Sequence, residues 1–173
     1  PHDVKGLVDL LGGQEKATAR LDSLFLADSR LNADANPDIS GLIGQYAHGN
    51  EPSHHTIYIY NYLGQPQKTQ KRIHEVFQTM YTDKPDGVCG NEDVGQMSAW
   101  YVMSAMGLYQ VEPCGGIYQL TAPLVREASF NVSKDKTFTI RTKGKGTLVK
   151  RWKLNGKRLD RTYITHAEIM AGG

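Results

Sequence analysis

The stretch "QMSAWYVMSAMGLYQVEPCGGIYQLTAPL", residues 96–124, changes its hydrophobic period near its middle. Its first half is strongly apolar and ends at Gly107, which predicts a buried helix. After Pro113 polar and apolar residues alternate, as in "GIYQLTAPL", which predicts a strand. The stretch therefore marks a change from helices to strands.

Helical patterns precede this point. "DVKGLVDLLGG", residues 3–13, has apolar residues at i, i+3, i+4 and i+7, with Asp3 as N-cap and two glycines as a stop. Further helices are expected over 14–25, over 55–63 and from Pro66, a residue suited to a first turn. Residues 27–55 between them are rich in Asn, Asp, Gly and Pro and predict a long loop.

Alternating segments follow Pro113, and Asn155-Gly156 is the signal of a type I′ hairpin between the last two. Helices followed by an antiparallel sheet indicate an α+β fold. We expect two parts: residues 1–113, mainly helical, and residues 114–173, a β-strand region.

Composition narrows the classes of function. The chain has 173 residues, the length of one ordinary domain, and no apolar run near the roughly 20 residues of a membrane span. Between Arg126 and Arg161 there are 12 Lys or Arg against three acids. These bases often alternate with apolar residues, which favours the wet face of a sheet over nucleic-acid binding. Cys89 and Cys114 leave the disulfide state open.

The loop "HGNEPSHH", residues 48–55, holds three histidines, an asparagine and a glutamate. A zinc site is disfavoured because adjacent histidines on a helix point about 100° apart, and no H-x-x-x-H pair occurs. Glu51 and Pro52 are also typical of a helix start, since an acid is favourable at the positive helix N-terminus.

A second loop, "CGNEDVG", residues 89–95, places Asn91, Glu92 and Asp93 in front of the apolar helix. One acid would suffice as a helix cap. Three hydrogen-bond acceptors between Gly90 and Gly95 exceed that need, and the glycines would let the backbone approach a ligand closely. A carboxylate in apolar surroundings can have a shifted pKa, as general acid or base catalysis requires. The aromatic side chains of Trp100 and Tyr101 behind them favour core packing over sugar stacking.

Three blocks, "PHDVKGLVDLLGG", "HGNEPSHHTIYIYNYLGQPQKTQ" and "GNEDVGQMSAWYVMSAMGLYQVEP", resemble the C-terminal part of glycoside hydrolase family 92. The resemblance implies a calcium-dependent, inverting exo-α-mannosidase that removes mannose from glycans, with α-1,2-linked mannose as the expected substrate. It also implies that residues 1–113 are the last helices of an (α/α)6 barrel and that residues 114–173 follow it.

The resemblance implies roles for particular residues. Asp93 stands at the general-base position, and Asn91 stands where some family members carry a second aspartate. His48 and Glu51 would bind the sugar, and Asn50 would help to hold Ca²⁺, a cation that prefers oxygen ligands. The division of sugar and calcium contacts within residues 48–55 stays open.

The general acid of the family lies upstream of the block that begins at Pro1. We therefore expect this chain to be part of a longer enzyme and to be inactive alone, and its orphaned barrel helices to self-associate. The resemblance implies a bacterial protein that is periplasmic, secreted or on the cell surface. The alternative is a non-catalytic carbohydrate-binding or structural module whose loop acids serve as caps and calcium ligands.

Overall fold

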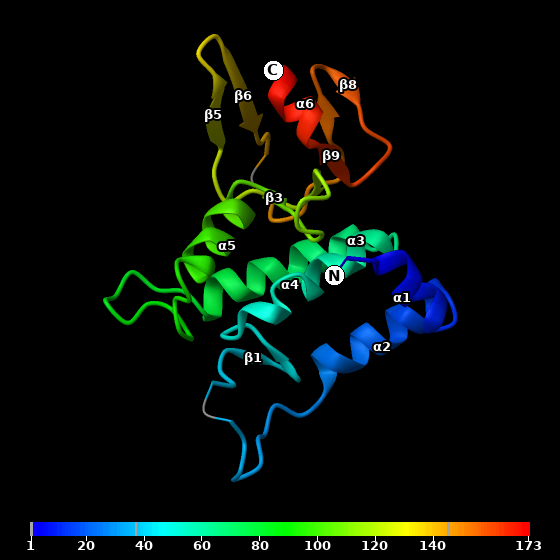
Figure 1. The fold of residues 1–173 in the computed structure, drawn as a ribbon, viewed down its shortest axis with the longest axis vertical. Coiled ribbons are helices and arrows are strands. Elements are labelled where there is room, and N and C mark those ends of the chain that lie inside the picture. Colours follow the sequence, from blue (N-terminus) through cyan, green and yellow to red (C-terminus); the bar gives the residue numbers. More distant parts are fainter. Residues whose placement is uncertain (1, 37, 145) are drawn as a thin grey trace.

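A computed structural model describes residues 2–36, 38–144 and 146–173. Figure 1 shows helices α1 to α5 as one body, with most strands and the last helix gathered at one end of it. The α-helices are α1 (Val4–Leu10), α2 (Gln14–Leu26), α3 (Ile59–Tyr62), α4 (Pro66–Thr79), α5 (Gln96–Ala105) and α6 (His166–Ala171), and short 3₁₀ helices cover Glu51–Ser53 and Thr56–Tyr58.

The strands form small antiparallel groups. They are β1 (Leu42–Ile43), β2 (Tyr46–Ala47), β3 (Leu108–Tyr109), β4 (Ile117–Leu120), β5 (Glu127–Ser133), β6 (Lys136–Arg141), β7 (Lys153–Leu154), β8 (Lys157–Arg158) and β9 (Tyr163–Thr165). The pairs β1–β2, β5–β6 and β7–β8 are hairpins, and β3, β4 and β9 form a three-stranded sheet in the order β3-β4-β9. The predicted α+β class with an antiparallel β region is confirmed.

Local signals explain several helix boundaries. The carboxylate of Asp3 accepts a hydrogen bond from the backbone N–H of Gly6 at 2.7 Å, so the predicted N-cap of α1 is confirmed. Pro66 is the first residue of α4, also as predicted. The single helix expected over 55–63 is instead a 3₁₀ turn followed by the short α3. The β-branched residues Thr56 and Ile57 disfavour a regular α-helical start there.

The expected long loop over 27–55 contains a hairpin that the sequence does not predict. β1 and β2 are two residues each, too short to show alternation, and they are joined through Gly44 and Gln45. Gly44 has φ +60°, and a Cβ there would lie 2.4 Å from the Leu24 carbonyl oxygen. The turn therefore packs directly against α2, which only a glycine permits.

Two hydrophobic clusters form the core of the protein. The larger lies among the helices and includes the fully buried side chains of Tyr46, Tyr58 and Trp100. The smaller lies under the strands and includes Leu108 and Phe138. Strand β3 precedes the expected boundary at residue 113 but pairs with β4 beyond it, so the helical and strand parts share one sheet.

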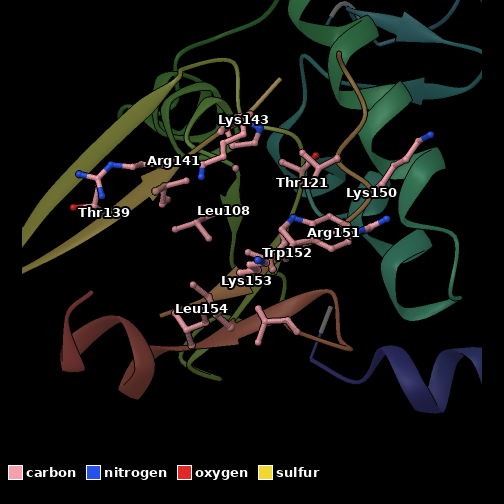
Figure 2. Close-up of a pocket in the computed structure, with 18 of the residues that line it drawn as sticks. Leu108, Thr121, Thr139, Arg141, Lys143, Lys150, Arg151, Trp152, Lys153 and Leu154 are labelled. Atoms are coloured by element: carbon pink, nitrogen blue, oxygen red, sulfur yellow. The ribbon is translucent and has the colours of Figure 1, made fainter. Parts of the chain in front are cut away.

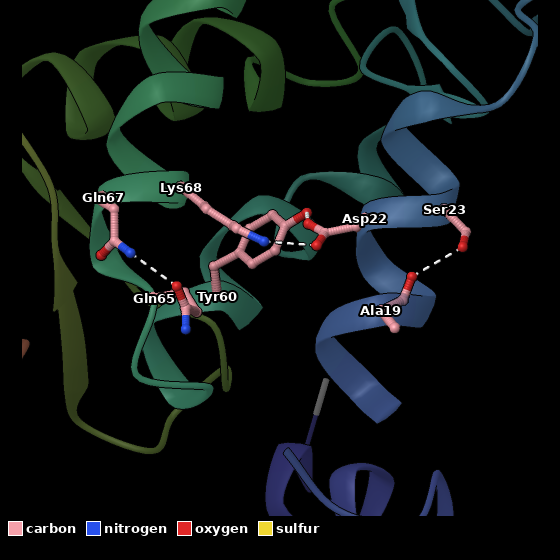
Figure 3. A network of polar contacts seen from close by, with 7 residues as sticks. All are labelled: Ala19, Asp22, Ser23, Tyr60, Gln65, Gln67 and Lys68. Carbon is pink, nitrogen blue, oxygen red and sulfur yellow. Dashed lines mark hydrogen bonds and ion pairs between the residues drawn. The ribbon is translucent and has the colours of Figure 1, made fainter. Parts of the chain in front are cut away.

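Polar contacts tie α2 to α3 and α4 (Figure 3). Asp22 accepts hydrogen bonds from the Tyr60 hydroxyl at 2.8 Å and from Lys68 Nζ at 2.6 Å. Partial burial opposes ionisation of Asp22, but these two bonds prevail and lower its pKa. The contacts thus hold α2 against α3 and α4.

The turn between β7 and β8 has the predicted type I′ character, because Asn155 and Gly156 both have positive φ, 49° and 81°. The basic side chains of Lys153, Lys157 and Arg158 on these strands are exposed, as expected for a solvated face. Among the described helices, none combines the length and the apolar character that crossing a membrane requires.

Candidate functional site

The two loops singled out in the sequence touch each other through their backbones. A Cβ on Gly90 would lie 2.3 Å from the carbonyl oxygen of Gly49, and a Cβ on Gly49 would lie 3.0 Å from the carbonyl oxygen of Cys89. The first loop is also held to the β1 side, where Gly49 N–H donates to the Ser40 carbonyl at 3.0 Å. Glycine at both positions is what allows this approach.

This contact brings Glu51 and Asp93 together. Burial is the first cause that raises the pKa of Glu51, and the adjoining carboxylate of Asp93 and the charge of Asp38 raise it further. One carboxylate oxygen of Glu51, Oε1, is buried without a hydrogen-bond partner among the described residues. Asp93 itself is exposed, as are Asn50 and Asn91 beside the pair. Two acids of unequal burial therefore meet at an open edge of the helical body.

His48, three residues before Glu51, is fully buried. Its Nδ1 is 2.8 Å from the Tyr46 hydroxyl, and its Nε2 is 2.8 Å from the Tyr81 hydroxyl. Tyr81 donates to the Met97 carbonyl, so its oxygen accepts from His48 Nε2–H. Burial, with a smaller effect of His54, lowers the pKa of His48 to about 3. The ring is therefore neutral and both of its nitrogens are engaged within the core.

His54 links the first loop to α5. It stacks on His48 with ring centroids 4.7 Å apart, and its Nε2 donates to the His48 carbonyl at 3.0 Å. Gln96 at the start of α5 lies 3.2 Å from its Nδ1, and the Trp100 indole N–H donates to the His54 carbonyl at 3.1 Å. Residues 48–54 are thus fixed at both ends around Glu51.

The second loop is held by the neighbour of Asp93. The Glu92 carboxylate accepts from both the backbone N–H and the hydroxyl of Ser98, each at 3.0 Å, and so caps the third residue of α5. Asp93, Val94 and Gly95 all have positive φ, 44°, 57° and 87°. Three successive left-handed residues reverse the chain between the cap and the helix, which leaves Asp93 outside the capping contact.

The side-chain oxygen atoms around Glu51 are of the type that binds a hard cation. The orphaned Oε1 of Glu51, the Asp93 carboxylate and the amide of exposed Asn50 are ligands that Ca²⁺ accepts. Their number falls short of the roughly six to eight ligands of a calcium site, and no group of three His, Cys, Asp or Glu gathers in the described parts of the chain. The residues fit part of a calcium shell.

Glu51 and Asp93 lie on the two touching loops, each with an exposed asparagine of the same loop, Asn50 and Asn91, whereas His48 is fully buried. The expected core role of Trp100 is confirmed, since its side chain has no exposed surface. Sequence reasoning missed Tyr46, Tyr81 and Gln96. A tyrosine two residues before His48 carries no signal, because aromatic residues are also common in cores.

Comparisons with known proteins agree with the resemblance in the sequence. The model of the glycosyl hydrolase family 92 catalytic domain matches residues 1–173. An uncharacterized secreted glycosidase of Arthroderma benhamiae is 34% identical over 179 residues, which cover 100% of this chain and 21% of that protein.

Solved structures agree as well. The family GH92 α-mannosidase BT3965 of Bacteroides thetaiotaomicron, in complex with mannoimidazole, is 38% identical with a TM-score of 0.91, over 99% of this chain and 23% of that one. The family GH92 inverting mannosidase BT2199 of the same species is 38% identical with a TM-score of 0.82, over 99% and 25%. The chain thus spans about a quarter or less of the length of these relatives. It belongs to glycoside hydrolase family 92.

Proposed function

We propose that this chain is the base-bearing part of a longer, inverting exo-α-mannosidase that releases mannose from glycans. The observation that carries the proposal is the meeting of Glu51 and Asp93 at an open edge where two glycine-clamped loops touch. The likeness to an α-mannosidase and to an inverting mannosidase supports the substrate and the stereochemical course.

In this mechanism Asp93 accepts a proton from the water that attacks the anomeric carbon. Its exposure gives the carboxylate access to water, as this role requires. Asn91, an amide at a position where a second acid could stand, binds the same water through its carbonyl oxygen. Inversion requires a general acid roughly 6.5 to 9.5 Å from the base, and we assign that acid to the remainder of the enzyme.

Glu51 and Asn50 are assigned to the sugar and to calcium, and bound Ca²⁺ would supply positive charge to orient sugar hydroxyl groups. The buried Oε1 of Glu51, which lacks a partner, supports this assignment. His48 acts differently from the sugar-contacting role that the resemblance implies. Because both of its nitrogens bind tyrosines, it holds the loop from below.

The decisive test is Asp93→Asn in the full-length enzyme. We expect kcat on an α-mannobioside to fall by orders of magnitude with an unchanged melting temperature, because Asp93 is exposed and its carboxylate caps no helix. Asp135→Asn, an exposed acid at the β5–β6 turn, is the matched control and should keep full turnover. Near-normal turnover of Asp93→Asn would remove Asp93 from the base role.

Two further measurements define the activity. NMR of the first product should detect β-mannose from an α-mannoside, as inversion requires. A panel of α-1,2-, α-1,3- and α-1,6-mannobioses should be cleaved fastest at the α-1,2 linkage. The isolated 173-residue chain should cleave none of them, and turnover by that chain would show that it contains a complete site. Absence of turnover by the full-length enzyme on every linkage would favour the non-catalytic carbohydrate-binding alternative.

The secreted relative supports export of the protein from the cell. We propose an extracellular or periplasmic location, where mannose-containing glycans would be the encountered partners. Detection of the full-length protein in the cytoplasmic fraction alone would contradict this location.

A further inference from the structure

A cavity of about 580 Å³ lies between the strand region and the end of the helical body. Its walls come from the 107–108 turn, the 120–123 segment, β6 and residues 148–154, and none of the residues in loops 48–55 or 89–95 lines it. Figure 2 shows Leu108 lying between Arg141 and Lys143 on one side and Trp152 to Leu154 on the other. The volume is within the range of small-molecule sites, roughly 300 to 1,000 Å³.

The cavity gathers two buried hydrogen-bonding groups that have no partner. Among the described residues, four buried side-chain polar atoms lack one, and two of these, Thr121 Oγ1 and Trp152 Nε1, belong to residues of this wall. Thr121 is only 1% exposed. Both atoms expose less than 1 Å², so each meets a ligand only when its side chain rotates towards the cavity, and a buried polar group without a partner gains a hydrogen bond by doing so.

The wall that carries Trp152 is fixed in place. The Gln70 side chain on α4 accepts from the backbone N–H of Val149 at 2.6 Å and donates to its carbonyl at 3.1 Å. The Trp152 carbonyl accepts from the backbone N–H of Leu159 at 3.0 Å. The backbone of Thr121 is held as well, since its N–H donates to the Gly107 carbonyl at 3.0 Å. The backbone that carries each of the two donors is therefore fixed.

The charged side chains around the cavity favour an anionic ligand. Lys143, Lys150, Arg151 and Lys153 line the cavity and are exposed, and none of them forms an ion pair within the described ranges of the chain. Arg141 is already paired with Glu127. Among the described residues that line the cavity, none has an acidic side chain. The apolar floor, which includes Leu108 and Phe138, suits the carbon skeleton of a small molecule.

We propose that this cavity is a second ligand site, which binds an acidic sugar unit: its ring lies on the apolar floor, its hydroxyls bond Thr121 and Trp152, and its carboxylate or phosphate faces the lysines. The choice of a sugar rests on the proposed function. The choice of an anion rests on the cavity itself. Such a site would hold an acidic glycan by a unit other than the one being cleaved.

The test is calorimetric titration of the full-length enzyme with glucuronate and with glucose 6-phosphate, with neutral glucose as the control. We expect either acid to bind at least tenfold more tightly than glucose and to weaken with added salt. A preference between the two identifies the anionic group as carboxylate or phosphate. Equal binding of glucose, or no binding of either acid, would overturn the proposal.

Substitutions in the cavity wall test whether the ligand binds there. Trp152→Phe removes the N–H and keeps the aromatic ring, and Thr121→Val removes the hydroxyl at similar volume. Each should weaken acid binding by about fivefold or more, since each removes one donor to the ligand. The double variant of Lys150→Gln and Arg151→Gln should weaken it further, whereas Lys134→Gln at the β5–β6 turn should not.

Binding that is unchanged in the cavity variants would lie elsewhere and would refute the site. Melting curves of each variant check that it folds, and mannosidase turnover, which uses the Glu51–Asp93 edge, should stay at the wild-type level. Turnover tests the proposed function and calorimetry tests the cavity, so either can fail without the other.

Discussion

Gly49 and Gly90 meet backbone against backbone, and through them the loop that carries Glu51 is set against the loop that carries Asp93. The contact leaves no room for a methyl group, because a Cβ on Gly90 would lie 2.3 Å from the Gly49 carbonyl oxygen. Since the obstacle is backbone and not a flexible side chain, the loops must separate to admit one.

Gly90→Ala should therefore lower both the melting temperature and kcat of the full-length enzyme. The contact sets the loop of the proposed base, Asp93, against the loop of Glu51, and a misplacement of about 1 Å at a catalytic group can cost on the order of a hundredfold in rate. Gly146→Ala is the control, because a Cβ there meets nothing closer than 4.0 Å. Equal behaviour of the two variants would show that the close contact is unimportant.

Glu92 holds the start of α5 and its neighbour Asp93 is the proposed base, so Glu92→Ala should distinguish the two roles. The variant loses both bonds from Ser98, so the free energy of unfolding should fall by about 1 kcal/mol, as for other N-terminal caps. The measurement is urea unfolding beside turnover at a temperature where the variant is folded. Loss of kcat comparable with that of Asp93→Asn, without loss of stability, would assign Glu92 to catalysis instead.

Much of this arrangement follows from the sequence, and some of it does not. The period change near Pro113, the Asp3 cap and the Asn155-Gly156 turn depend on neighbouring residues, and each was predicted. The β1–β2 hairpin and the burial of His48 depend on contacts with α2 and Tyr81, which are distant in sequence. Short-range patterns contain no information about such contacts.

Val94 has a left-handed backbone conformation, so we expect its replacement to stabilise the protein. A β-branched residue at φ 57° is strained by about 1–3 kcal/mol, and its side chain is fully exposed, so it gains no packing in return. Val94→Asn should raise the free energy of unfolding by about 1 kcal/mol, because asparagine tolerates this region. Val102→Asn on the exposed face of α5 should lower it slightly. A loss of stability in Val94→Asn would mean that the valine packs against another part of the full-length enzyme.

Acid should destabilise the protein through its buried histidines. Burial lowers the pKa of His48 to about 3 and lowers that of His54 as well, whereas the unfolded chain has the ordinary value near 6.5. Well above pH 6.5 the rings are neutral in both states and contribute no pH dependence. As the pH falls from about 6.5 towards 3, the unfolded state binds more protons and stability declines. Urea unfolding between pH 8 and pH 4 measures this, and His48→Gln should show a shallower decline. A flat profile would contradict it.

An apolar groove of about 570 Å³ along α1 and α2 predicts how the isolated chain behaves in solution. Leu7 and Leu11 line it while 43% and 37% exposed, and Leu10 beside them is 89% exposed. In a longer enzyme we expect neighbouring helices to cover this face, but the 173-residue chain alone should bury it by self-association. Sedimentation velocity at micromolar concentration should detect dimers or larger species. The double variant of Leu7→Lys and Leu11→Lys should shift the chain towards the monomer, because charge in the groove opposes burial, whereas Val102→Lys on α5 should not. A wild-type chain that stays monomeric as its concentration rises would show that the groove does not drive association.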